Sequence, residues 1–235
     1  MALADLMSLS LSQDKTKKEG LSEERIQAQI PILRQYIAYW REYPDMFVEF
    51  LCGETNPENF NLFFYQRVFL RAAMRHRYMY ATFPRAYSKS FLSVLILMLR
   101  CVLFPNGHLF VTTGGKEQAA GIEREKVEEL CKLIPGLHHE IDWSRGASKA
   151  SKNMVEYKFK NGSKLDIVAA QQSSRGKRAT GGLMEEVILI DKTLLNEVII
   201  PLMNVDRRLS DGTRDESEIT NKSQIYVTTA GWKNS

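Results

Sequence analysis

The feature that most constrains the fold is a short polar loop, residues 85–90, between two apolar segments. It reads Arg-Ala-Tyr-Ser-Lys-Ser. Residues 78–83 before it are aromatic and β-branched, which predicts a buried strand ending at Pro84. Residues 91–104 behind it are apolar but shorter than the roughly 20 residues of a membrane span, so they predict a buried helix and no membrane partner. With the strand HLFVTT that follows, this order of segments predicts an α/β fold.

A loop between a strand and a helix can bind phosphate, because backbone N–H groups and the helix N-terminus converge on the phosphate oxygens. In such a P-loop Lys89 would pair with the β- and γ-phosphates of ATP, and Ser90 would bind Mg²⁺. Two glycines of the usual Walker A pattern are absent, since Ser88 precedes the lysine and residues 83–85 are Phe-Pro-Arg. The residues alone therefore leave open a plain strand-to-helix loop with an N-cap serine and an incidental lysine.

Two acidic candidates could complete a hydrolytic site, which needs one carboxylate near the metal and another to deprotonate water. Glu185 and Glu186 follow Gly-Gly-Leu-Met. Asp191 follows Val-Ile-Leu-Ile and is by pattern the better Walker B acid. The local pattern thus favours Asp191 without excluding the glutamate pair.

The order of these segments resembles the N-terminal ATPase domain of the large terminase subunit, the DNA-packaging motor of phages. In that family Walker A often opens with arginine and reads R-x-x-[GS]-K-[ST], which residues 85–90 fit. An Arg-Gly pair (Arg175 and Gly176) stands about eight residues before the glutamates, and Pro201 about fifteen after them, as in the family. A glutamine element at Tyr65-Gln66 and a Thr-Thr-Ala-Gly run from Thr228 extend the resemblance over about residues 60–231.

The resemblance implies an α/β P-loop NTPase of the ASCE type, with a mainly parallel central sheet flanked by helices. ATP and Mg²⁺ are the cofactors that it implies, and its spacing favours Glu185 and Glu186 over Asp191. The implied ATP-binding residues are Gln66, Arg85, Ala86, Tyr87, Ser88, Lys89 and Ser90. The implied roles are catalysis for Glu186, Arg85 and Lys89, Mg²⁺ binding for Ser90 and Glu185, and coupling of hydrolysis to movement for Thr228 and Thr229.

Double-stranded DNA is the main partner implied, together with the small terminase subunit, the portal protein of the procapsid and a homo-oligomeric ring that could be a monomer in isolation. The net charge of +4 is too small to indicate nucleic acid by itself. A basic stretch from residue 145 to 178 could follow a phosphate backbone, or could be an ordinary solvated face. Its DNA-binding candidates are Lys158, Lys160, Lys164, Arg175, Lys177 and Arg178.

We expect three regions along the chain: a disordered or partner-docking leader (1–20), a helical segment (21–55) and the P-loop ATPase domain (56–235). The family's C-terminal nuclease domain is absent from this sequence, so we expect no nuclease activity. Three scattered cysteines without C-x-x-C spacing indicate reduced, cytoplasmic thiols, and the resemblance implies that this is the cytoplasm of the host cell. A helicase-like translocase is disfavoured because no Ala-His element follows the acidic pair, and a degenerate module that binds nucleotide without hydrolysis stays open.

Overall fold

The computed structural model describes residues 23–54, 56, 58–113, 118–144, 149–151, 154–169, 176–214 and 218–230. The predicted leader, residues 1–20, and the site candidate Arg175 lie outside these residues. The chain divides into two units between Tyr39 and Trp40, within helix α2 (Glu23–Glu42).

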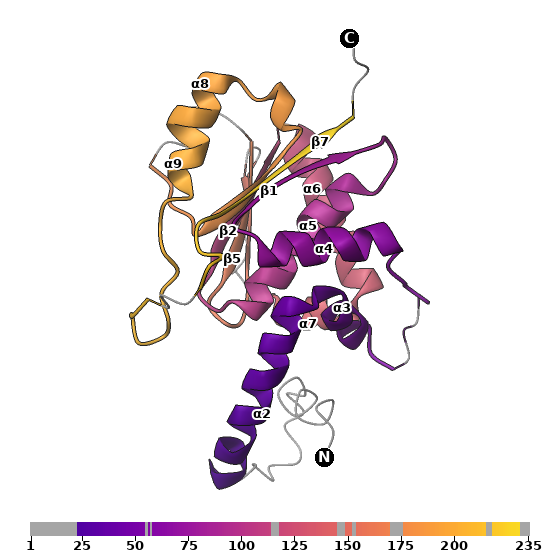
Figure 1. Ribbon diagram of the computed structural model, residues 1–235, viewed down its shortest axis with the longest axis vertical. Helices are drawn as coiled ribbons and strands as arrows, with labels where there is room; N and C mark the ends of the chain where they lie inside the picture. Colours follow the sequence, from indigo (N-terminus) through magenta and orange to yellow (C-terminus); the bar gives the residue numbers. More distant parts are fainter. Residues whose placement is uncertain are drawn as a thin grey trace. The chain divides into compact units, whose positions relative to one another are not determined.

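The second unit contains one sheet and two layers of helices. Its strands are β1 (Tyr78–Phe83), β2 (His108–Thr113), β3 (Lys149–Ser151), β4 (Met154–Lys158), β5 (Lys164–Ala169), β6 (Gly181–Glu185) and β7 (Ser223–Thr229). Its longer helices are α3 (Pro44–Cys52), α4 (Phe64–Arg75), α5 (Lys89–Leu103), α6 (Gln118–Leu133) and α7 (Pro135–Glu140). Helices α4, α5 and α6 lie on one side of the sheet, and the segment labelled α8 and α9 lies on the other (Figure 1).

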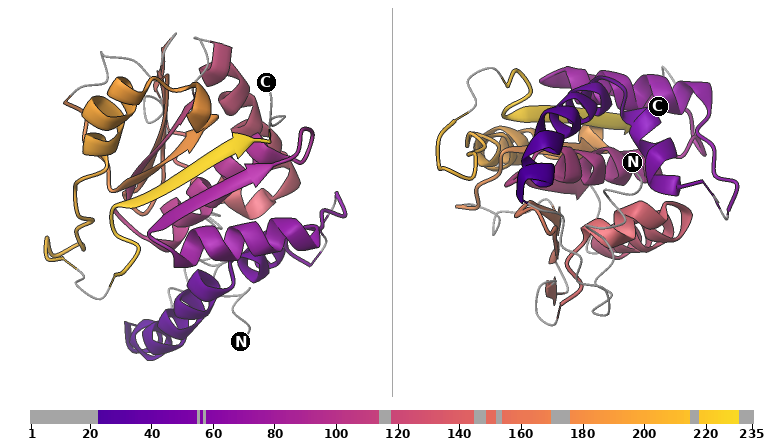
Figure 2. Two further views of the ribbon diagram at one scale, coloured as in Figure 1. Left: turned by 45° about the horizontal axis from the view of Figure 1, so that its top comes forward. Right: turned by 90° about the horizontal axis from the view of Figure 1, so that it is seen from below.

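The sheet has seven strands in the order β1-β7-β6-β2-β5-β4-β3. The four pairings from β1 to β5 are parallel, whereas β4 pairs antiparallel with both β5 and β3. Figure 2 shows β7 beside β1 with both arrows pointing the same way. Because consecutive segments cross over the sheet, the carboxyl ends of β1, β6 and β7 meet at one edge, where parallel α/β sheets bind ligands. The predicted mainly parallel α/β architecture is confirmed.

Helix α5 forms the centre of the core. Its residues from Phe91 to Cys101 are buried on every side, which explains why the segment is apolar without an amphipathic period. The one charged side chain there, Arg100, is buried and donates to the carbonyl oxygens of Ala73 and Thr220. The predicted buried helix is therefore confirmed. The packing of the rest of α5 fixes the position of its N-terminus at Lys89.

The predicted burial of residues 78–83 is wrong. They form strand β1 as expected, but β1 lies at the edge of the sheet, and Tyr78 and Tyr80 are 59% and 61% exposed. Tyrosine has an apolar ring and a polar hydroxyl, so the same composition suits a half-exposed strand.

Strands β4 and β5 form a hairpin around Asn161-Gly162. Strands β4 and β5 pair antiparallel with Tyr157 opposite Leu165. Gly162 has a φ of 84°, a left-handed conformation that glycine adopts without a steric cost.

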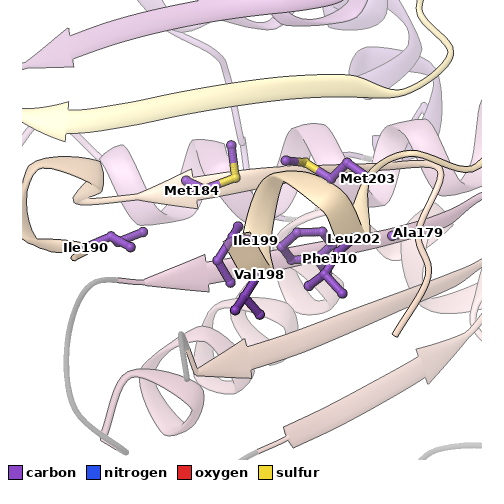
Figure 3. Close-up of a cluster of buried hydrophobic side chains, with 8 residues drawn as sticks. All are labelled: Phe110, Ala179, Met184, Ile190, Val198, Ile199, Leu202 and Met203. Carbon is purple, nitrogen blue, oxygen red and sulfur yellow. The ribbon is translucent and has the colours of Figure 1, made fainter. Parts of the chain in front are cut away.

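The far side of the sheet is covered by a helical segment in three consecutive parts: α8 (Lys192–Leu194), a π-helical turn (Leu195–Ile199) and α9 (Ile200–Leu202). Pro201 lacks an N–H and would clash with the carbonyl four residues earlier in a regular α-helix, which accounts for the wider π turn. Figure 3 shows the hydrophobic cluster beneath it, where Val198, Ile199 and Leu202 meet Phe110 and Met184 of the sheet. This cluster fixes β6, whose last residue belongs to the candidate site.

The three cysteines are free thiols, and Cys52 and Cys101 are buried. Burial raises the pKa of Cys131 to about 12 and that of Cys52 above its ordinary value. Within the described residues no His, Cys, Asp and Glu side chains gather into a cluster of metal ligands. Among the same residues, no helix combines the length and the apolar character needed to cross a membrane.

Two glycines give opposite predictions for stability. A Cβ on Gly136 in α7 would lie 2.7 Å from the Leu51 carbonyl oxygen, whereas a Cβ on Gly121 in α6 would meet nothing within 4 Å. We expect Gly136→Ala to lower the free energy of unfolding by about 1–3 kcal/mol, because the atom that the new Cβ would meet belongs to the backbone of Leu51 and cannot easily move away. Gly121→Ala should raise it by up to about 1 kcal/mol through helix propensity. Urea unfolding followed by circular dichroism compares the two, and equal effects would contradict the packing described at α7.

Candidate active site

The candidate site lies where β1, β6 and β7 end. Residues 84–88 connect β1 to α5, Glu185 is the last residue of β6, and Thr228 and Thr229 end β7. In the sheet register Glu185 lies beside Val227, and Thr229 lies beside Phe83. Segments more than 90 residues apart in the sequence are thereby brought into hydrogen-bonding distance, as the 96-residue separation of Lys89 and Glu185 illustrates.

The loop of residues 84–88 has an unusual backbone. Ala86 and Ser88 have φ values of 65° and 52°, in the left-handed region that favours glycine. Such residues cost on the order of 1–3 kcal/mol each and gather at functional sites. The position where the common Walker A pattern has glycine, Ser88, therefore keeps the backbone geometry that glycine would supply. The absence of glycine from the sequence does not remove the loop conformation.

Lys89 and Ser90 meet both glutamates. The ammonium Nζ of Lys89 lies 2.5 Å from Glu185 Oε1 and 3.0 Å from Glu186 Oε1. The hydroxyl of Ser90 donates to the same Glu185 Oε1 at 2.5 Å. The side chains of Lys89 and Glu185 are only 14% and 3% exposed, so these contacts are shielded from water.

Glu186 is held by the end of β7. Its carboxylate accepts hydrogen bonds from the Thr229 backbone N–H at 3.0 Å, from the Thr228 hydroxyl at 3.3 Å and from the Thr229 hydroxyl. Partial burial works against ionisation of Glu186, but the hydrogen bonds from Thr229 and Lys89 and the charge of Lys89 outweigh it, so the pKa of Glu186 lies below its ordinary value. Glu186 is therefore a carboxylate at neutral pH. Its own φ of 50° turns the chain sharply out of β6.

Asp191 lies in a different setting. The apolar residues before it form no strand, because Val187–Leu189 is a 3₁₀ turn in which Ile188 and Leu189 are each 64% exposed. The carboxylate of Asp191 is exposed and caps α8 by accepting a hydrogen bond from the Leu194 backbone N–H at 2.9 Å. The buried strand that would make Asp191 a Walker B acid is absent from this described segment.

Gln66 is buried, 4% exposed, at the first turn of α4. Its Oε1 accepts a hydrogen bond from the Phe63 backbone N–H at 2.9 Å, which fixes the orientation of the amide. Gln66 lines a cavity of about 650 Å³ together with residues 84–91 and Thr229. Tyr87, in the middle of the loop, packs against Tyr65 with the ring centroids 5.4 Å apart.

Part of the cavity wall was not predicted from the sequence. Phe60 precedes α4, and Lys126 and Glu129 come from α6, where they form an ion pair at 2.6 Å. The i, i+3 spacing of the last two indicates only a pair on a helix surface. Their position beside the loop depends on the packing of α6 against α5, which no local pattern encodes.

Three of the six DNA-binding candidates lie on the β4–β5 hairpin. Lys158 and Lys164 are paired in the register, and Lys160 is exposed at the turn between them. Acidic side chains accompany them, since Lys164 pairs with Glu156 at 3.4 Å. His108, on the neighbouring strand β2, contacts the buried Asp166 of β5 at 2.7 Å. Of the remaining candidates, Lys177 is half-buried and Arg178 is exposed.

The oxygen atoms around Lys89 suit a magnesium ion. Mg²⁺ prefers hard oxygen ligands and is commonly bound by one or two carboxylates together with nucleotide phosphates. The Glu185 carboxylate and the Ser90 hydroxyl, 2.5 Å apart, provide such oxygens beside the cavity. The residues present therefore fit the ion that the resemblance implies.

The fold and this cluster define an α/β protein with a strand–loop–helix site at the carboxyl edge of its sheet. Compared by sequence, the chain matches no family model and no curated protein. Compared by structure, it is similar to the large terminase of bacteriophage HK97, with a TM-score of 0.53 and 13% identity over 72% of this chain and 33% of that chain. It is also similar to the ATPase domain of the Thermus phage P74-26 large terminase, with a TM-score of 0.46 and 15% identity over 70% and 65% of the two chains.

The similarity to the HK97 protein shows that the chain has a fold found in phage large terminases. The fold class expected from the sequence is confirmed. The chain spans 33% of the length of that relative, so the activity and partners of a whole terminase are matters for the proposal below.

Proposed function

We propose that this chain is the ATP-hydrolysing motor domain of a phage large terminase, which drives double-stranded DNA into a procapsid. One observation carries the proposal: Lys89, Ser90, Glu185 and Glu186 converge beside a cavity of about 650 Å³. A positive ammonium, a hydroxyl and two carboxylates are the groups that phosphoryl transfer to water requires.

The loop of residues 85–90 would bind the phosphates. The start of α5 presents backbone N–H groups, and Lys89 adds a positive charge that can pair with the β- and γ-phosphates. Arg85 is exposed beside the cavity. Its guanidinium has the fork geometry to bind γ-phosphate oxygens as charge develops on them, which lowers the barrier to transfer.

Ser90 and Glu185 would hold Mg²⁺. When bound, the ion polarises the phosphoryl oxygens and neutralises part of their charge. Glu185 suits this role because it is almost fully buried at the end of β6, so its position is fixed by the sheet.

Glu186 would orient and deprotonate the attacking water. A general base must be ionised, and the lowered pKa of Glu186 keeps it so at neutral pH. Thr228 and Thr229 bind the same carboxylate, so a change in the base would be transmitted to β7. This connection supports the coupling role proposed for the two threonines.

Gln66 would recognise adenine. Its Oε1 is oriented by the Phe63 backbone N–H, so its amide N–H groups are positioned to donate to a ring nitrogen of the base. Its burial in the wall of the cavity supports binding of the base at this end.

The direct test measures binding and magnesium-dependent hydrolysis of ATP by the unmodified chain, with and without duplex DNA. We expect binding together with slow hydrolysis that DNA accelerates. Binding without any hydrolysis would support the degenerate nucleotide-binding module instead. Neither binding nor hydrolysis would refute the motor proposal.

The β4–β5 hairpin is the proposed contact with the DNA backbone. Because Glu156 and Asp166 neutralise part of its charge, we expect weak binding that depends strongly on salt. Replacing Lys158, Lys160 and Lys164 together by glutamine should weaken duplex binding about tenfold at low salt and flatten its salt dependence. Fluorescence anisotropy between 50 mM and 200 mM salt measures both quantities. Replacing the exposed Lys192 on α8 controls for loss of one general charge, and an unchanged affinity of the triple variant would exclude the hairpin.

The small terminase subunit, the portal protein, a homo-oligomeric ring and a place in the host-cell cytoplasm stay predictions. They follow from the resemblance to the terminase family.

A further inference from the structure

The ammonium of Lys89 touches the same oxygen atom that the proposed function assigns to the metal. Glu185 Oε1 lies 2.5 Å from Lys89 Nζ and 2.5 Å from Ser90 Oγ. Glu186 Oε1 lies 3.0 Å from the same ammonium. One positive charge thus stands between two carboxylates at the point where a divalent cation would have to bind.

While the Lys89 ammonium occupies this position, its charge and its volume both oppose a cation there. A metal–oxygen bond of about 2.1 Å to Glu185 Oε1 would bring the ion against an ammonium already at hydrogen-bonding distance from that oxygen. The two positive charges would repel each other in a site that is shielded from water, where Coulomb interactions are strong. The hydroxyl of Ser90 would also have to give up its hydrogen bond to Glu185.

Of the side chains in this cluster, Lys89 has the longest flexible stem. Glu185 is the last residue of β6, a central strand of the sheet, and it is buried in register with Thr113 of β2 and Val227 of β7. Glu186 is held by Thr228 and Thr229. Lys89 reaches both acids with a flexible four-carbon side chain, which can turn toward phosphate oxygens without moving α5.

We infer that Lys89 excludes a divalent cation from Glu185 and Ser90 until the phosphates of a nucleotide draw its ammonium away, so that metal and nucleotide occupy the site together. The inference rests on the proposed nucleotide site, since the phosphates are what release the lysine. It predicts that a residue needed to bind ATP is also the residue that prevents binding of the metal alone.

The test measures Mn²⁺ binding by electron paramagnetic resonance, without nucleotide and with a non-hydrolysable ATP analogue. For the wild type we expect weak binding of Mn²⁺ alone and at least about tenfold tighter binding with the analogue. For Lys89→Met we expect Mn²⁺ alone to bind at least tenfold more tightly than to the wild type, a gain of about 1.4 kcal/mol. Adding Glu185→Gln to Lys89→Met should remove the gain, which locates the ion at Glu185.

Lys126→Met is the matched control. Lys126 lines the same cavity and pairs with a carboxylate, Glu129, but that pair lies on α6. Its removal should leave the binding of Mn²⁺ without nucleotide unchanged, and an equal gain in this variant would mean that general charge, rather than the lysine at Glu185, controls the metal. Thermal unfolding confirms that each variant is folded before binding is compared.

The outcomes separate this inference from the proposed function. If the wild type binds the analogue with Mn²⁺ but folded Lys89→Met shows no gain for the metal alone, the exclusion is wrong and the nucleotide site stands. Tight binding of Mn²⁺ alone to the wild type also overturns the exclusion. If the wild type binds no nucleotide under any condition, the proposed function fails, and a gain in Lys89→Met would still support exclusion of the metal.

Discussion

Replacing Glu186 by glutamine is expected to lower the turnover number for ATP at least 100-fold, while the dissociation constant for ATP changes by less than about threefold. Glutamine keeps the shape of the side chain, and its one carbonyl oxygen can still accept the hydrogen bonds that the Thr228 hydroxyl and the Thr229 backbone N–H donate to Glu186 Oε2. It cannot accept a proton from water. Hydrolysis is measured as phosphate release at saturating ATP and magnesium. Binding is measured separately with a fluorescent ATP analogue, because turnover alone does not distinguish loss of the base from loss of the site.

Asp191→Asn is the control for this experiment. The two acids are five residues apart, but Asp191 is an exposed helix cap and asparagine caps helices about equally well. We therefore expect turnover within about twofold of the wild type. If Asp191→Asn abolished hydrolysis and Glu186→Gln preserved it, the assignment from apolar pattern would be correct and the assignment from spacing wrong.

The fold could be predicted where a segment carries its own physical signal. The apolar run of α5 and the Asn-Gly turn between β4 and β5 determine their structures locally. The exposure of β1 could not be predicted, because it depends on whether another strand pairs beyond it, which is a property of the whole sheet. The same limit applies to residues 187–190, whose apolar side chains read as a strand but form an exposed turn and the edge of the cluster under α9.

The residues of the candidate site could be predicted from the sequence, but their arrangement in space could be predicted only partly. Adjacent acids after one segment and a lysine after another indicate an edge of a parallel sheet, and the structure brings them within 3.0 Å of each other. The sequence pattern requires glycine before the lysine, because glycine adopts a positive φ without a steric cost. Ser88 has a positive φ although it is not a glycine, so the pattern could not predict this backbone conformation. Contacts across separate helices, such as that of Lys126 with the cavity, have no local signature.

Replacing Lys89 by alanine is expected to lower turnover by about 10²–10³-fold and to weaken ATP binding as well. Lys89 contacts both glutamates, so its loss removes a charge from the phosphates and leaves two carboxylates facing them. Repulsion between those carboxylates and the γ-phosphate adds to the loss. Phosphate release and binding of the fluorescent analogue, both with magnesium, measure the two effects.

Arg85→Ala is the variant with which Lys89→Ala is compared, because the two should differ in ATP binding. Arg85 belongs to the same loop but is exposed, and its proposed role begins only as charge develops on the γ-phosphate. Its loss should therefore reduce turnover with little change in ATP binding, whereas Lys89→Ala should reduce both. Equal retention of binding in the two variants would mean that Lys89 serves only the transition state. Loss of ATP binding in Lys89→Ala, together with gain of Mn²⁺ binding in Lys89→Met, would show that the same ammonium binds the two glutamates without nucleotide and the phosphates when ATP is bound.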